Sequence, residues 1–285
     1  MKPPPFDYLA PSTLDEALAL RAEHADDSLV LAGGQSAMPL LNLRMALPAA
    51  VIDLGRVPEL AGIREFDGGV AFGAMTRQRD AERSQLVQER LPLATQALAH
   101  VGHTTIKNRG TIGGTMAHAD PAAELPAVAL LLDGELVARS TRSERTIAAR
   151  DFFVGVLTTA LQPDELLVEV RLPGLSGRVG TSFLEVARRH GDFAVVAAGA
   201  AVALAGDGTI ADARLAFTGV GATAVRAYDA EATLRGAQPG DEIFAEAAAR
   251  AAAELEPGSD AHATAAYRRR IADVLARRAL KEATP

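Results

Sequence analysis

The sequence predicts an α+β fold in two parts, with a boundary near residues 174–178. Up to Pro173, segments that alternate in the manner of strands are mixed with helical segments. Pro173-Gly174 then ends an alternating run, and LSGRVG (175–180) is typical of a linker. Beyond it, two predicted strands are followed by helices alone. The 285 residues, 48% of them hydrophobic, suffice for one large domain or two ordinary ones.

The first part opens with a helix and several strands. Residues 12–24 begin with a Ser-Thr pair suited to an N-cap and carry apolar residues at helical spacing, which predicts a helix. SLVLAGG (28–34) predicts a buried strand that ends in a tight turn. Residues 49–57 and the alternating residues 68–76 predict two further strands.

The middle of the chain is predicted to hold helices and then short strands. Residues 76–100 are periodic and helical in parts, with an interruption at Pro92. ELPAVALLLD (124–133) predicts a helix, since Pro126 falls in its first turn, where proline is tolerated. Residues 134–141 and 144–153 predict short strands because they hold few residues that break a strand.

The strongest strand signals lie on either side of the predicted boundary. Residues 165–174 alternate clearly. Residues 194–221 read as two strands joined by a hairpin at Gly206-Asp207-Gly208. From about Asp241 the chain is helical, and the arginines from Arg268 onward predict a solvated basic face or a contact with an acidic partner.

Composition excludes several classes of protein. The net charge of −7 at pH 7 and the lack of a long basic run disfavour nucleic acid and anionic membranes as partners. The absence of cysteine excludes disulfides, a thiolate nucleophile, and cysteine-ligated zinc or iron–sulfur sites in this chain. No signal-peptide core or membrane-spanning apolar run is apparent, so we expect a soluble cytoplasmic protein.

Two short segments, AGGQS (32–36) and TIGGT (111–115), each pair two glycines with hydroxyl residues. Gly33 and Gly34 can adopt positive φ and let a ligand approach the main chain, while Gln35 and Ser36 add donors. Successive amides in such a turn form a concave anion site. The alternative is a plain strand-to-loop turn, and neither segment has the lysine and spacing of a phosphate-binding P-loop.

The second segment adds carboxylates to the same chemistry. Amides and hydroxyls suit a pyrophosphate, and Asp120 and Glu124 suit ribose hydroxyls. Alternatively, Asp120 caps the following helix and Glu124 stabilises its N-terminus. Together the two segments predict glycine turns whose main-chain amides hold a diphosphate from both sides.

Other candidate sites are weak. GVGATA (219–224) resembles a dinucleotide-binding turn but lacks the acidic residue that should follow it. His100, His103 and His118 do not have the spacing of metal ligands, so no metal site is expected. No catalytic pair of carboxylates or Ser-His-Asp arrangement stands out, and we expect no side chain that acts as an acid–base catalyst.

Residues 32–44 (AGGQSAMPLLNLR) and 106–126 (IKNRGTIGGTMAHADPAAELP) closely resemble the two FAD-binding segments of the flavoprotein (medium) subunit of molybdenum hydroxylases. This family includes carbon monoxide dehydrogenases, xanthine dehydrogenases and nicotine dehydrogenases. The resemblance extends to residues 2–18, 158–173 and 183–202. It implies an FAD-binding domain over 1–175 of the vanillyl-alcohol oxidase type, with subdomains at about 1–56 and 57–175. A C-terminal domain over 176–285, with a three-stranded antiparallel sheet and a helical bundle, is then expected.

The resemblance also implies where non-covalent FAD binds. The first segment would wrap the pyrophosphate, and the second would complete the grip. Asp120 and Glu124 would lie near the ribose and adenosine, and the loop with Asp192 would lie near the isoalloxazine ring. Glu185 stands where some relatives place a lysine near the flavin, so a flavin contact of that type is not expected. The implied contacts are Ala32, Gly33, Gly34, Gln35, Ser36, Ala37, Met38, Val101, Gly102, Thr111, Gly114, Thr115, Asp120, Glu124, Leu167, Asp192 and Phe193.

The implied function is electron transfer. In the family, a large molybdopterin subunit hydroxylates the substrate, and a small subunit with [2Fe–2S] clusters passes electrons to FAD on the medium subunit. An external acceptor then removes them, in an assembly expected to be a dimer of heterotrimers. Two alternatives stay open: a self-sufficient FAD-dependent oxidase or dehydrogenase, and a non-enzymatic domain with two structural glycine turns.

Overall fold

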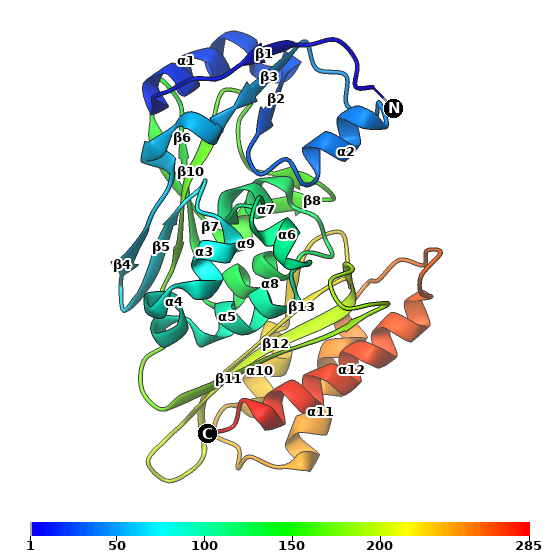
Figure 1. Cartoon of the computed structure of the whole chain (residues 1–285). Helices are drawn as coiled ribbons and strands as arrows, with labels where there is room; N and C mark the ends of the chain where they lie inside the picture. Colours follow the sequence, from blue (N-terminus) through cyan, green and yellow to red (C-terminus); the bar gives the residue numbers. More distant parts are fainter. Residues whose placement is uncertain (1) are drawn as a thin grey trace.

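The computed structural model describes residues 2–285, which fold into three successive α/β units (Figure 1). The first unit is a three-stranded sheet in the order β1-β3-β2, with both neighbouring pairs parallel. Thr13 caps the first helix by accepting a hydrogen bond from the amide of Glu16, as the sequence predicted. The elements are β1 (Asp7–Leu9), α1 (Leu14–His24), β2 (Ser28–Leu31), α2 (Ala37–Asn42) and β3 (Ala50–Asp53).

The second unit is a five-stranded antiparallel sheet in the order β4-β5-β10-β6-β7, with helices over one face (Figure 1). Its strands are β4 (Ile63–Phe66), β5 (Gly69–Gly73), β6 (Glu135–Arg139), β7 (Glu144–Ala148) and β10 (Leu166–Leu172). Its helices are α3 (Gln78–Arg83), α4 (Gln85–Arg90), α5 (Pro92–His100), α6 (Thr104–Lys107), α7 (Ile112–His118), α8 (Glu124–Leu131) and α9 (Ala149–Phe152). A small hairpin pairs β8 (Phe153–Gly155) with β9 (Thr158–Thr159).

The third unit is an antiparallel sheet, β11-β12-β13-β14, covered by three helices. The expected three strands are present, and the two-residue β14 adds a fourth at the edge of the sheet. The first strand begins at Val179, inside the stretch expected to be a linker. The elements are β11 (Val179–Ala187), β12 (Ala194–Leu204), β13 (Ile210–Thr218), β14 (Val225–Arg226), α10 (Tyr228–Leu234), α11 (Asp241–Glu254) and α12 (Ala265–Glu282).

Helices α5 and α8 lie between the two larger sheets. Helix α8 contacts β12 and β13, and α5 contacts β11, while α12 covers the opposite face of the C-terminal sheet. Strand β11 shows this arrangement residue by residue, since Phe183 packs into the core around α5 and α8 and Leu184 packs into the core around α11 and α12. The C-terminal sheet is therefore buried on both faces.

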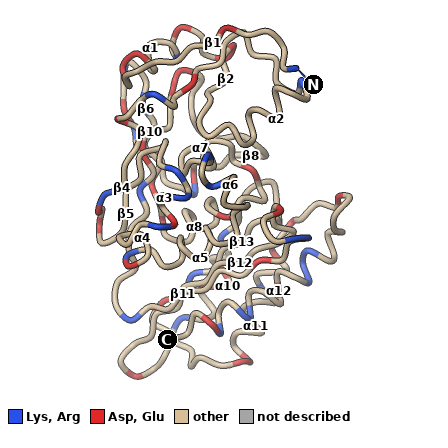
Figure 2. Tube along the Cα trace, in the orientation of Figure 1, with Lys and Arg blue, Asp and Glu red and all other residues tan. Residues whose placement is uncertain are grey.

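Two local predictions need correction. The predicted strand over 144–153 ends at Ala148, and α9 follows, because Ala149 and Phe152 lie on one helical face and are both buried. The expected solvated arginine face of α12 includes Arg268, which is buried and donates to the backbone carbonyls of Val195 and Gly219. Charges of both signs are interspersed along the trace (Figure 2). None of the described helices has the length and apolar character to cross a membrane.

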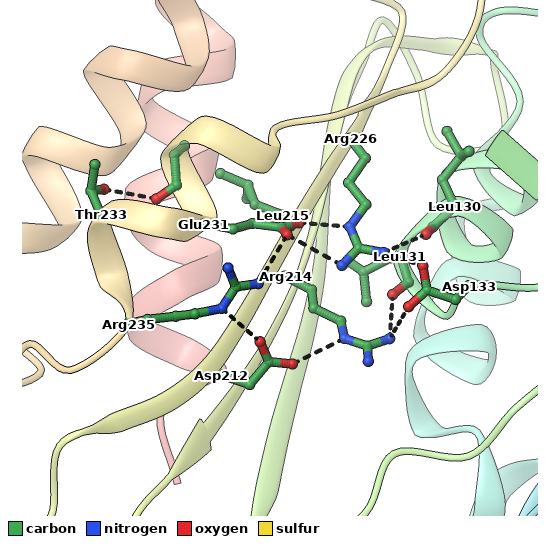
Figure 3. A network of polar contacts seen from close by, with 11 residues as sticks. Leu130, Leu131, Asp133, Asp212, Arg214, Leu215, Arg226, Glu231, Thr233 and Arg235 are labelled. Atoms are coloured by element: carbon green, nitrogen blue, oxygen red, sulfur yellow. Dashed lines mark hydrogen bonds and ion pairs between the residues drawn. The ribbon is translucent and has the colours of Figure 1, made fainter.

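A network of ion pairs joins the C-terminal unit to α8 (Figure 3). Arg226 donates to the carbonyl oxygen of Leu130 at 3.1 Å and to Asp133 at 2.6 Å, while its Nε lies 2.8 Å from Glu231. Arg214 donates to the carbonyl oxygen of Leu131 at 3.0 Å. Two guanidinium groups therefore satisfy the carbonyls at the C-terminus of α8.

Candidate functional site

The first glycine segment follows β2 at the edge where the parallel strands β2 and β3 both end. Gly34 has φ +77°, the left-handed conformation that favours glycine. Gly33 packs so closely on the second segment that a Cβ there would lie 2.3 Å from the carbonyl oxygen of Arg109. The structure therefore brings together two segments that lie about eighty residues apart in the sequence.

The backbone amides of this first segment form a row of available donors. Those of Gly33, Gly34, Gln35 and Ser36 donate to no acceptor within residues 2–285. The side chain of Gln35 folds back toward the carbonyl oxygen of Gly33, at 3.4 Å. A series of unpaired amides in a glycine turn is the donor set that binds a phosphate or diphosphate group.

The second segment is not a glycine turn, which corrects the prediction. It is the first turn of α7, whose N-cap Thr111 accepts a hydrogen bond from the amide of Gly114 at 3.0 Å. The amides of Ile112 and Gly113 donate to the carbonyl oxygens of Thr76 and Ala74, both at 2.9 Å. Because these amides are already bonded, the expected grip by main-chain amides from both sides reduces to amides on the first segment and hydroxyls on the second.

Two polar residues that follow β5, Arg77 and Gln78, hold the second segment in place. The amide of Gln78 donates to the carbonyl oxygen of Gly110 at 2.9 Å, and its side chain donates to the hydroxyl of Thr115 at 2.8 Å. Arg77 donates to the carbonyl oxygen of Arg109. Gln78 is only 4% exposed. Neither side chain was predicted from the sequence, since polar residues after a strand are usually on the surface.

A third contact, between Gly102 and the loop over 188–193, brings several more of the predicted residues together. Gly102 meets the loop over 188–193, where a Cβ at Gly191 would lie 2.4 Å from His103 Nδ1. The loop carries Asp192 and Phe193, whose ring is 62% exposed. A pocket of about 380 Å³ lies here, lined by Gly102, His103, Thr104, Thr105, Lys107 and His190. Val101 is buried beside it, and α6 runs from this pocket toward the glycine segments.

Among the predicted side chains, those of Val101, Thr111, Glu124 and Leu167 are buried, whereas Asp120 is half-buried. The carboxylate of Asp120 accepts from the amide of Ala122 at 2.8 Å, and the cap of α8 is Ala123, so Asp120 is not the N-cap. Glu124 is only 5% exposed. Leu167 is buried in the core of the second unit.

Glu124 faces a second acidic residue across the boundary between the units. Burial raises the pKa of Glu124 from 4.5 to about 8, and the nearby carboxylate of Glu185 adds to this increase. Burial also raises the pKa of Glu185 to about 7. Removal from water disfavours the charged form of each group, and repulsion between them does so further.

These pKa values predict that stability falls as pH rises. In the folded chain Glu124 keeps its proton up to about pH 8, whereas an unfolded glutamate releases its proton near pH 4.5. The contribution of this proton to the free energy of unfolding is therefore complete below pH 4.5 and is lost as pH rises through about 8. Each pKa unit corresponds to about 1.4 kcal/mol. Urea unfolding at a series of pH values should therefore show Glu124→Gln gaining stability relative to the native protein as pH increases. A difference that does not change with pH would contradict the prediction.

Comparisons with known proteins cover almost the whole chain. The family model described as the FAD binding domain in molybdopterin dehydrogenase matches residues 4–175. The model described as the CO dehydrogenase flavoprotein C-terminal domain matches residues 181–283. The two matches therefore include both glycine segments and the loop with Asp192.

Individual relatives are similar to the chain over almost their whole length. The chain is 41% identical to subunit alpha of the 6-hydroxypseudooxynicotine dehydrogenase complex of Paenarthrobacter nicotinovorans, over 99% of this chain and 96% of the relative. It is 42% identical to caffeine dehydrogenase subunit beta of Pseudomonas sp. (strain CBB1), with the same coverage. Carbon monoxide dehydrogenase from Hydrogenophaga pseudoflava has a similar structure, with a TM-score of 0.96, 38% identity, and coverage of 99% of this chain and 98% of that one.

Proposed function

The chain belongs to the FAD-binding medium subunits of the molybdenum hydroxylases, and from that premise we propose that it passes electrons from [2Fe–2S] clusters of a small subunit to an external acceptor. Its relatives are oxidoreductase subunits. The sequence holds no cysteine, so a cysteine-ligated cluster must be on another chain. The observation that carries the proposal is the row of unpaired amides at Gly33–Ser36, which fits the diphosphate of FAD.

The proposed FAD site combines the three contacts described above. Residues 32–38 would hold the pyrophosphate from one side through amides, and Thr111, Gly114 and Thr115 would approach from the other side. The isoalloxazine ring would lie near Val101 and Gly102, facing the loop with Asp192 and Phe193. The pocket beside Gly102, and the exposed ring of Phe193, support this placement. Asp120, Glu124 and Leu167 complete the proposed set.

In this arrangement the protein binds and orients, and FAD, when bound, supplies the electron-transfer chemistry. The hydroxyl of Thr111 is fixed by the cap of α7 and can still donate its proton to a phosphate. The hydroxyl of Thr115 accepts from Gln78 and would have to release its own hydrogen bond to the carbonyl oxygen of Thr111, at 3.2 Å, to do so. We propose an FAD-binding domain over residues 1–175, with subdomains at about 1–56 and 57–175, and a C-terminal domain over 176–285 that contributes the loop with Asp192.

The proposed assembly contains a large molybdopterin subunit and the small [2Fe–2S] subunit, as a dimer of heterotrimers in the cytoplasm. The large subunit would hydroxylate the substrate, and this chain would receive only electrons. The relatives are named for a complex or as single subunits of dehydrogenases, which supports a multi-subunit enzyme. No acid–base catalyst for substrate hydroxylation is therefore proposed here.

The test compares the complex with the isolated chain. Native complex should contain molybdenum and iron together with FAD, and the substrate that it oxidises, chosen from a panel that includes nicotine and caffeine, should bleach its flavin absorbance. The isolated FAD-loaded chain should be bleached by dithionite but not by that substrate. Rapid bleaching of the isolated chain by the substrate would instead establish a self-sufficient flavin dehydrogenase. A chain that refuses added FAD would establish a non-enzymatic role.

A further inference from the structure

Four exposed arginines lie at one end of the C-terminal unit. Arg188 and Arg189 directly follow β11, and Arg269 and Arg270 lie in the second turn of α12. Figure 2 shows Lys and Arg both at the start of α12 and at the neighbouring end of the C-terminal sheet. We call these four residues the basic patch.

Hydrogen bonds join the two halves of the basic patch. The guanidinium group of Arg188 lies 2.8 Å from Nδ1 of His262, in the loop that leads into α12. The amide of His262 donates to the carboxylate of Asp260 at 2.8 Å, and Asp260 pairs with Arg268, in the first turn of α12, at 2.7 Å. The end of β11 and the start of α12 therefore form one continuous surface.

The charge of the basic patch is not neutralised by neighbouring acids. Among residues 2–285, none of its four arginines forms an ion pair with a carboxylate. The adjoining segments 188–193 and 254–273 contain only two acids without an ion pair, Asp192 and Glu256. The basic patch is therefore a positive surface on a chain whose net charge is −7.

The basic patch borders the pocket beside Gly102 without lining it. In the loop over 188–193, Gly191 packs against Gly102 and His190 lines the pocket, whereas none of the four arginines does. The exposed ring of Phe193 lies in the same loop. The arginines therefore stand on open surface next to the proposed flavin site, rather than around a cavity for a small molecule.

Charge, rather than apolar surface, distinguishes the basic patch. Exposed large apolar side chains of the first two units lie on other segments: Leu43, Met45 and Leu47 follow α2, and Val154 and Val156 lie in the β8–β9 hairpin. Permanent subunit interfaces are the more hydrophobic class, whereas transient electron-transfer encounters are small, below about 1,200 Å² of buried surface. Complementary charge brings such transient partners together. The basic patch therefore fits a transient acidic partner better than a permanent subunit.

We propose that the basic patch is the docking surface for an acidic one-electron redox protein, which serves as the external electron acceptor. This inference rests on the function proposed above. Opposite charge steers such a partner to this side of the chain, because the remaining surface is negative overall and repels it. Two partner molecules in turn remove one electron each from reduced FAD, and the protons that are released pass to solvent.

The first experiment measures docking on the FAD-free chain. The probe is the soluble domain of oxidised cytochrome b5, an acidic one-electron carrier, and isothermal titration calorimetry gives its dissociation constant. The double variant Arg189→Glu, Arg270→Glu reverses two charges and breaks no side-chain hydrogen bond within the described residues, since Arg270 only stacks on the ring of Tyr267. At about 50 mM salt the dissociation constant should rise at least about tenfold, and the difference should shrink at about 300 mM salt.

The matched control is the double variant Arg83→Glu, Arg278→Glu. It makes the same change of net charge at exposed arginines on α3 and toward the far end of α12. Its dissociation constant should stay within about twofold of that of the native chain, because distant exposed charges are screened. Equal dissociation constants in the native chain and both variants, or no binding by the native chain, would overturn the inference whether or not the chain binds FAD.

The second experiment uses the FAD-loaded chain, reduced with one equivalent of dithionite. Stopped-flow absorbance compares the rate of flavin reoxidation by cytochrome b5 with the rate of reoxidation by neutral benzoquinone. The ratio of the cytochrome rate to the quinone rate should fall about tenfold in Arg189→Glu, Arg270→Glu and stay unchanged in the control. An unchanged ratio in both variants would overturn the inference, while reoxidation by benzoquinone would leave the proposed function standing.

Assembly with the large and small subunits distinguishes a transient partner from a permanent one. Both double variants should assemble as the native chain does, as measured by size-exclusion chromatography with light scattering. Loss of assembly in Arg189→Glu, Arg270→Glu alone would show that a permanent subunit covers the basic patch and would overturn the inference.

Discussion

Replacing Glu231 with alanine is expected to lower the free energy of unfolding by about 3–5 kcal/mol. Glu231 is 0% exposed, and its Oε1 accepts from Arg226 Nε at 2.8 Å and from the amide of Leu215 at 2.9 Å. Without this carboxylate, a buried amide loses its partner, and a largely buried guanidinium keeps only the exposed Asp133 and the carbonyl oxygen of Leu130. The cost comes mainly from the buried charge that is then only partly compensated, rather than from the net strength of the pair.

Urea unfolding, followed by circular dichroism, measures this effect. The matched control is Lys281→Ala, which removes an exposed ion pair of 2.8 Å with Asp241 and should cost less than about 1 kcal/mol. Glu231→Gln should fall between the two, because it keeps a hydrogen-bonding oxygen but not the charge. A loss for Glu231→Ala no larger than that of the control would contradict the role assigned to the network.

The ion-pair network also matters for the proposed FAD site, because the C-terminal domain holds α8 at both ends. At its C-terminus, Arg226 binds the carbonyl oxygen of Leu130. Just before its N-terminus, the hydroxyl of Thr218 donates to the carbonyl oxygens of Pro121 at 2.6 Å and Ala123 at 2.8 Å. The position of Glu124, the first residue of α8, therefore depends on contacts from the C-terminal domain.

The burial of each element explains how well that element could be predicted from the sequence. Residues 194–221 gave two clear strands because their hairpin is marked by Gly206-Asp207-Gly208, and the structure confirms both strands. Strand β11 gave no signal from its residues alone, because Phe183 and Leu184 are packed into cores on opposite faces and the polar–apolar alternation is lost. Tertiary packing, and not the local sequence pattern, therefore determines that these residues form a strand.

The same limit applies to the candidate site. Glycine pairs with nearby hydroxyls identified both segments, because close backbone approach leaves a mark in the sequence. Whether a glycine pair forms a turn or starts a helix depends on neighbours, and here the cap at Thr111 and the carbonyl oxygen of Ala74 decide for the helix. The role of Gln78 is set by a hydrogen bond to Thr115, 37 residues away, which no local pattern encodes.

Gly114→Val is expected to weaken FAD binding at least about a hundredfold, or roughly 2.7 kcal/mol. A Cβ at Gly114 would lie 2.6 Å from Thr111 Oγ1 and 3.3 Å from the Cβ of Ala32. The valine would therefore displace the hydroxyl that caps α7 and push the first segment away from the second. The proposed diphosphate would lose hydroxyl contacts on one side and correctly placed amides on the other. Fluorescence titration of FAD-free protein with FAD measures the change.

Two controls separate this steric effect from simpler causes. Thr111→Ala removes the cap, at a cost of about 1 kcal/mol in stability, but leaves the space at Gly114 open, so it should weaken FAD binding less than the valine does. Gly258→Val adds the same bulk at a position with no atom within 4 Å and should bind FAD like the native protein. Circular dichroism must show that Gly114→Val is folded. A folded, yellow Gly114→Val with unchanged affinity would mean that FAD does not lie between these segments, since the valine leaves no room for close approach there.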